Sequence, residues 1–87
     1  GTEPRVFIMD EPTIGIDVGS KAEIREMIRG IAAEGVGVVL ITAEIDELTT
    51  LCDRVLVMFR GRLVASLEGA AIQRETILHA SVSGAAA

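Results

Sequence analysis

Aromatic residues and cysteine are nearly absent from this chain of 87 residues. Phe7 and Phe59 are its only aromatic side chains, so it lacks the stacking platform used by single-stranded nucleic-acid binders. Cys52 is the single cysteine, which excludes a disulfide framework and a cysteine-based zinc cluster. Only two prolines occur, and 49% of the residues are apolar, which excludes a disordered tail or a proline-rich linker.

Positive charge is also scarce. Eight Lys and Arg stand against thirteen Asp and Glu, for a net charge of −5, and the basic residues form no stripe. This balance argues against a nucleic-acid partner or an anionic membrane surface. No apolar run approaches the ~18 residues of a membrane span, and no signal peptide opens the chain. We therefore expect a cytoplasmic chain.

Strand and helix signals alternate along the sequence. The expected order is a strand at 6–9, a helix from Ser20 to Gly35, a strand at 36–41, a helix at 44–52, strands at 55–59 and 63–67, and a helix at about 72–80. The first two strands are continuous apolar runs, typical of strands buried on both faces of a parallel sheet. The last two are joined by a tight turn at Arg60 and Gly61. This order predicts an α/β fold with a mostly parallel sheet and a terminal β-hairpin.

The first helix has clear boundary signals. Residues 15–19 are typical of a loop, and Ser20 with Glu23 has the pattern of a capping box. Gly35 follows the last helical apolar residues, as expected of a residue that ends a helix. We expect the helix to begin at Ser20.

Asp10 and Glu11 are the most informative chemical feature. Two adjacent carboxylates follow the first apolar run, and Pro12 then ends the strand. Ligands of open α/β sheets bind at the carboxyl ends of the strands. Such an Asp suits Mg²⁺, which takes one or two carboxylates plus waters and phosphate oxygens, and the Glu suits orienting or deprotonating a water. A polar strand end before a turn is the alternative explanation of the same residues.

The surrounding sequence resembles a known family. The run from Val6 to Thr13, followed by Gly15, Ile16 and Asp17, resembles the Walker B motif and D-loop of ABC-type ATPases. Residues 41–44 fall where that family has its switch loop, 52–58 resemble the strand that follows, and 61–64 resemble the terminal hairpin. The resemblance covers residues 3–68 with almost no gaps. It implies the C-terminal portion of a P-loop NTPase core.

A narrower resemblance is carried by residues 15–21 and 41–45, and by the tail around 74–78. These look like the C-terminal nucleotide-binding half of tandem sugar-import ATPases, which energise uptake of monosaccharides such as ribose, galactose or xylose. The resemblance implies a peripheral subunit on the cytoplasmic face of the membrane. Its implied partners are a second nucleotide-binding domain, membrane permease subunits and, indirectly, a periplasmic or extracellular sugar-binding protein.

The resemblance also implies roles for single residues. Asp10 would hold Mg²⁺ through the ion's water shell, and Glu11 would be the general base or water-orienting carboxylate in ATP hydrolysis. The D-loop, which meets the opposing ATPase domain, would be Gly15, Ile16 and Asp17. Ala43 occupies the switch position that contacts the nucleotide. The family has a histidine there, and alanine can neither donate a hydrogen bond nor carry charge.

Several family motifs have no counterpart in these 87 residues. The sequence contains no G-x-x-x-x-G-K-[ST] phosphate loop, no signature motif and no Gln loop. The resemblance therefore implies that residues 1–80 are a partial nucleotide-binding domain and 81–87 a flexible tail. The full-length parent would be an ATPase that uses ATP and Mg²⁺, and the isolated chain would be inactive.

Two other interpretations remain open. One is a fragment of another P-loop ATPase, of the DNA-repair or chromosome-maintenance type, and the other is an interaction module that binds no nucleotide.

In the family, the phosphate-loop strand lies between the strands at 36–41 and 55–59. Without it these two strands either pair directly or pair with a second copy of the chain. We expect self-association.

Overall fold

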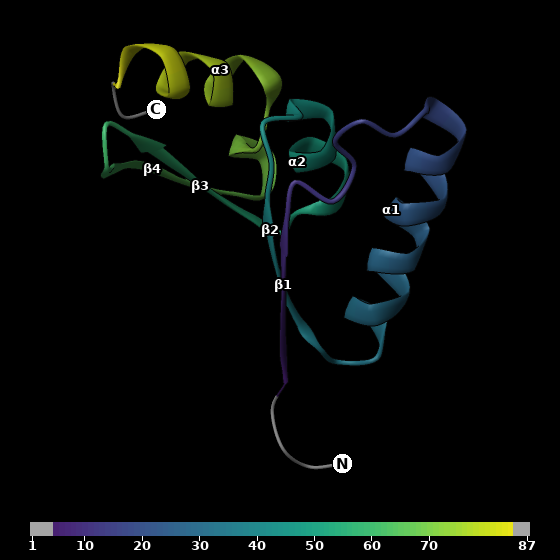
Figure 1. Cartoon of the computed structure of the whole chain (residues 1–87). Coiled ribbons are helices and arrows are strands. Elements are labelled where there is room, and N and C mark those ends of the chain that lie inside the picture. Colours follow the sequence, from purple (N-terminus) through teal and green to yellow (C-terminus); the bar gives the residue numbers. More distant parts are fainter. Residues whose placement is uncertain (1–4, 85–87) are drawn as a thin grey trace. The chain divides into compact units, whose positions relative to one another are not determined.

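The computed structural model describes residues 5–84 of the chain. These residues divide into two compact units, the first ending at Ala43 and the second beginning at Glu44. Figure 1 shows the helices and strands of both units. The expected β-α-β-α-β-β-α order is confirmed, with one added turn of 3₁₀-helix before the last helix.

The first unit is a strand-helix-strand arrangement. It consists of β1 (Val6–Asp10), α1 (Val18–Ala33) and β2 (Gly37–Ile41). The two strands pair in parallel, with Val6 opposite Gly37 and Asp10 opposite Ile41. Helix α1 packs against β2 and runs back beside the strands (Figure 1). The parallel pairing expected of the first two strands is therefore confirmed.

The start of α1 differs from the prediction. The N-cap is Asp17, whose carboxylate accepts a hydrogen bond from the Ser20 backbone N–H at 2.9 Å. The helix thus begins at Val18, and Ser20 lies inside its first turn, because an Asp side chain three residues earlier already satisfies that N–H. The other end is as predicted, since Gly35 follows the C-cap with a φ of +89°.

The expectation that both early strands are buried on two faces is wrong. In β1 only Met9 is buried, while Val6 and Ile8 are 66% and 65% exposed. Alternation along paired strands puts Val6, Ile8, Val39 and Ile41 on one face, and all four are exposed. Helix α1 covers part of the opposite face, where Met9 lies. An apolar run shows that a strand can be buried on both faces. Whether both faces are in fact covered depends on the other helices and strands that pack against it.

The second unit is a hairpin covered by helices. Its elements are α2 (Ile45–Leu51), β3 (Arg54–Phe59), β4 (Arg62–Glu68), the 3₁₀ turn η1 (Gly69–Ala71) and α3 (Arg74–Ser83). Strands β3 and β4 pair antiparallel, with an irregularity at Val57/Met58. Helix α3 packs against β3 and α2. The buried core consists of Val55, Val57, Ala65, Leu67, Ile77 and Ala80.

The prediction of a mostly parallel sheet needs correction. Within residues 5–84 there are two sheets of two strands each, β1 with β2 in parallel and β3 with β4 antiparallel. Direct pairing between β2 and β3, one of the two expected outcomes, is not found in this part of the chain. Helix α3 continues to Ser83, so it extends into the range predicted as a flexible tail. Residues 85–87 of that tail lie outside the described residues, and the single domain expected for 1–80 stays a prediction.

Candidate functional site

The predicted site residues of the first unit gather at the carboxyl ends of β1 and β2. Asp10, the last residue of β1, lies opposite Ile41, the last residue of β2. The Glu11 backbone N–H donates to the Ile41 carbonyl oxygen at 2.7 Å, which extends the pairing by one residue. Since the strands are parallel, Ala43 follows β2 at the same edge. The structure thus brings together Asp10, Glu11 and the segment that carries Ala43.

Glu11 has an unusual backbone conformation. Its φ is +50°, in the left-handed region that residues with a Cβ atom rarely adopt. Such a conformation costs on the order of 1–3 kcal/mol and persists only where neighbouring contacts hold it. Asp10 is exposed and Glu11 is half-buried, so neither residue is enclosed by the protein. The strain falls on the residue that the sequence predicts to activate water.

Two consecutive turns connect β1 to α1. The Ile14 N–H donates to the Glu11 carbonyl oxygen, and the Ile16 N–H donates to the Thr13 carbonyl oxygen, each at 3.2 Å. Gly15 has a φ of +74°, which explains a glycine at that position. Thr13 is only 1% exposed. The burial of this threonine was not predicted from the sequence, because turn threonines are ordinarily exposed and nothing in the local pattern marks this one.

Asp17 closes the same segment. Its carboxylate accepts hydrogen bonds from the backbone N–H and the side-chain Oγ of Ser20, at 2.9 and 3.4 Å. The Ser20 backbone N–H, and after it the Ser20 hydroxyl, holds the pKa of the Asp17 carboxyl below its usual range. The structure therefore gives Asp17 a local task, capping α1. Its expected contact with an opposing ATPase domain stays a prediction.

The donor set at this edge suits one kind of metal ion. Residues 5–84 contain no group of three or more His, Cys, Asp or Glu side chains arranged to hold a metal. Asp10 offers one exposed carboxylate. Mg²⁺ is commonly bound by one or two carboxylates, with waters and substrate phosphates completing the octahedron. Asp10 thus fits a magnesium ion carried with a phosphate ligand, and it does not fit an ion held by protein ligands alone.

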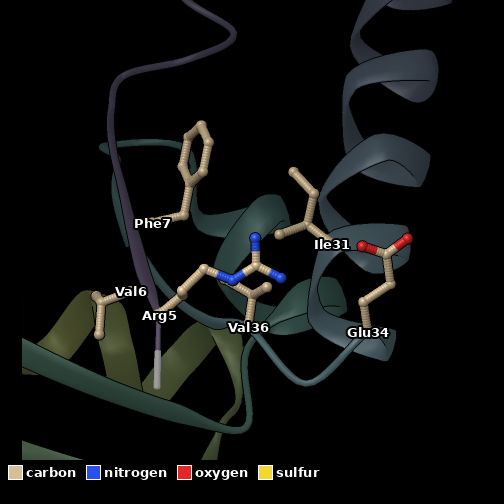
Figure 2. A pocket seen from close by; sticks show the side chains of 6 residues that line it. All are labelled: Arg5, Val6, Phe7, Ile31, Glu34 and Val36. Atoms are coloured by element: carbon tan, nitrogen blue, oxygen red, sulfur yellow. The ribbon is translucent and has the colours of Figure 1, made fainter. Parts of the chain in front are cut away.

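A cavity of about 380 Å³ lies at the opposite end of β1. It is lined by Arg5, Val6, Phe7, Ile31, Glu34 and Val36. Figure 2 shows Phe7 and Ile31 directed into the space between β1 and α1, while Val6 points the other way. The cavity contains none of the predicted site residues.

Among residues 5–84, no helix combines the length and the apolar character that crossing a membrane requires.

Comparison with known proteins identifies relatives over nearly the whole chain, although no family model matches it. A ribose import ATP-binding protein of Burkholderia mallei is 50% identical over 74 residues, 85% of this chain and 15% of the relative. The ribose import ATP-binding protein of Rhodococcus jostii is 48% identical over 86 residues, 99% of this chain and 17% of the relative. That of Geobacillus kaustophilus is 43% identical over 81 residues, 93% of this chain and 16% of the relative.

The resemblance to the sugar-import ABC ATPases is confirmed. These relatives carry ATP binding and ribose import in their names, and their identity of 43–50% extends over most of the chain. The chain spans 15–17% of the length of these three ribose import ATP-binding proteins. The matched segment includes the edge where Asp10 ends β1 and Glu11 follows it, since the Rhodococcus match covers 99% of the chain.

Proposed function

We propose that this chain is the C-terminal part of a nucleotide-binding domain in a tandem sugar-import ATPase, where it supplies the carboxylates for ATP hydrolysis. The supporting observation is the Asp10–Glu11 pair at the carboxyl end of β1, beside the end of β2, in a chain related to ribose import ATP-binding proteins. This edge is where ligands of open α/β sheets bind.

Asp10 and Glu11 have different tasks in this proposal. Asp10, which is exposed at the strand end, interacts with Mg²⁺ through the ion's water shell. The bound ion supplies positive charge that offsets the negative charge on the phosphate being transferred. Glu11 orients or deprotonates the attacking water, and its left-handed backbone turns the chain away from the strand direction at that point.

The segment after β2 sets a limit on this half-site. Ala43 stands at the switch position and brings neither a hydrogen-bond donor nor a charge. Hydrolysis at this half-site depends on Glu11 more than on the switch segment. Gly15, Ile16 and Asp17 form the D-loop that meets the second nucleotide-binding domain.

The partners follow from the proposed parent protein. The substrate carried is a monosaccharide, and the coupled proteins are membrane permease subunits and, indirectly, a sugar-binding protein outside the membrane. The ATPase lies on the cytoplasmic face of the membrane.

The 87 residues contain no phosphate-loop motif, and it is the backbone N–H groups and the Lys of that loop that bind the phosphates.

The isolated chain therefore binds Mg-ATP weakly or not at all. Asp10 and Glu11 repel phosphate when no metal is present. Isothermal titration calorimetry of the 87-residue chain with millimolar Mg-ATP is the test. We expect no binding heat, and a dissociation constant in the low micromolar range would contradict the proposed division of tasks.

The decisive experiment compares Glu11→Gln with Ala43→Ser in the full-length protein, with the other half-site disabled. Removing the carboxylate of Glu11 should slow single-turnover hydrolysis by about 10²–10⁴-fold, the usual effect of losing a general base. Ala43→Ser serves as the matched control and should change the rate little, since the switch group is already missing. An unchanged rate in Glu11→Gln would show that Glu11 has no catalytic role at this half-site.

A further inference from the structure

The turn between β1 and α1 contains a buried polar residue that the proposed hydrolysis does not use directly. Thr13 is 1% exposed, and Thr13 and Glu47 are the buried polar side chains of residues 5–84. Thr13 is not without an interaction partner. Burying a hydroxyl is costly unless it is hydrogen-bonded, so a buried threonine in a turn indicates a specific structural task.

Thr13 lies between Glu11 and the Asp17 cap of α1, in the segment that connects β1 to α1. On one side is Glu11, whose carbonyl oxygen accepts from the Ile14 N–H. On the other side the Thr13 carbonyl oxygen accepts from the Ile16 N–H, directly before the Asp17 cap of α1. The two turns share Thr13 and Ile14, and of these two residues Thr13 is the buried one, so displacement of Thr13 moves both turns.

The strained backbone of Glu11 needs neighbouring residues that hold it in place. A φ of +50° at a residue with a Cβ atom persists only where the surrounding structure holds it. On the strand side, the Glu11 N–H is tied to the Ile41 carbonyl oxygen at 2.7 Å. On the helix side, the first side chain removed from solvent is Thr13, since Pro12 is half-buried and Ile14 is exposed.

We infer that Thr13 is a positioning residue, whose buried hydroxyl holds the strained backbone of Glu11 and thereby aims its carboxylate at the attacking water. This inference rests on the proposed function. In this role Thr13 acts through Glu11 and needs no contact of its own with the nucleotide or the water, since it is 1% exposed. Its loss should therefore lower kcat while leaving nucleotide binding intact.

The test compares Thr13→Val, which keeps the shape and removes the hydroxyl, with Thr13→Ser, which keeps the hydroxyl. Both are made in the full-length protein beside Glu11→Gln, with Thr50→Val as a matched control at an exposed threonine of α2. We expect Thr13→Val to lower kcat about 10–100-fold, as small misplacements of a catalytic group do, with KM for Mg-ATP within about twofold. Thr13→Ser should restore most of kcat, and Thr50→Val should match the parent.

Rates are normalised to the folded fraction, measured by Mg-ATP binding. If Thr13→Val does not fold, Thr13→Cys, with its weak S–H donor, replaces it in the comparison with serine. The positioning role would be overturned by equal losses of kcat in the serine and hydroxyl-free variants, by an unchanged kcat in the hydroxyl-free variant, or by a rise in KM alone. Each of these results counts against the positioning role when Glu11→Gln shows its expected loss of rate. A Glu11→Gln protein with normal activity would instead overturn the proposed function, and the inference with it.

Discussion

Two residues with side chains adopt a positive φ within residues 5–84, and they do so for different reasons. Glu11 and Arg60 both have a φ of +50°. Arg60 is a central residue of the β3–β4 turn, where right-handed strand twist favours positive φ at both central positions, and Gly61 follows with +77°. The Arg60 guanidinium lies 5.4 Å from the centre of the Phe59 ring, a contact that offsets part of the cost. Glu11 is held by backbone hydrogen bonds at the candidate site, where its strained backbone sets the position of the carboxylate.

Asp17 provides a test based on pH. Its pKa is lower in the folded chain than in the unfolded chain, because the Ser20 N–H stabilises the carboxylate. The stabilisation is therefore complete above the usual pKa of an unfolded Asp and is lost as the pH falls through the lower pKa of the folded chain. We expect Asp17→Ala to lower the melting temperature at neutral pH, with a difference from the parent that shrinks as the solution becomes strongly acidic.

Asp17→Asn is the matched control, since asparagine also caps helices and does not titrate in this range. Melting followed by circular dichroism between neutral and strongly acidic pH gives the comparison. If Asp17→Ala destabilises the chain equally at both ends of that range, the ionised cap is not the cause.

Helix α3 ends on a glycine that no other residue replaces easily. Gly84 has a φ of +68°, and its N–H donates to the Ala80 carbonyl oxygen at 3.0 Å. A Cβ atom on Gly84 would lie 2.6 Å from Cδ1 of Phe59. We expect Gly84→Ala to destabilise the second unit by about 1–2 kcal/mol through the left-handed backbone alone, with displacement of the ring adding to it.

Gly30→Ala in α1 is the opposite case and a suitable control. Nothing lies within 4 Å of a Cβ built at Gly30, and the residue is inside a regular helix. Alanine should stabilise the chain there by about 0.5–1 kcal/mol. Urea unfolding of both variants provides the measurement. A Gly84→Ala protein as stable as the parent would mean that the ring moves aside and α3 ends differently.

Both units leave apolar strand surface uncovered. The face with Val6 and Ile8 is exposed, as are Leu56 and Met58 on β3. Within residues 5–84 each sheet has two strands and therefore edges that this part of the chain leaves unpaired, and β1 and β2 carry no lysine or proline that would block pairing. We expect the isolated chain to self-associate, with an apparent mass by light scattering that rises above the monomer as concentration increases.

Val39→Lys places a charge on the exposed face of β2 and should shift the chain toward monomer. Ala33→Lys adds the same charge on the exposed end of α1 and should leave association unchanged. A monodisperse monomer for the parent chain at high concentration would contradict the expectation.

Patterns confined to a few residues were readable from the sequence. The apolar run of β1 ended by Asp10 and Glu11, the glycine after α1, and the turn at Arg60 and Gly61 each depend on neighbours in the chain, and each was predicted. The family was predicted in the same way, because its motifs are local runs in a fixed order, and relatives 43–50% identical confirm it.

Features that depend on residues distant in the sequence were decided by tertiary contacts. The faces of β1 that are covered depend on elements many residues away, and the expected burial on both faces was wrong. The capping residue of α1 was misplaced because Asp17 and Ser20 are both good caps, and only the geometry of the preceding turns selects between them. The burial of Thr13 had no local signal at all, because solvent is excluded from a side chain by packing around it and not by its neighbours in sequence.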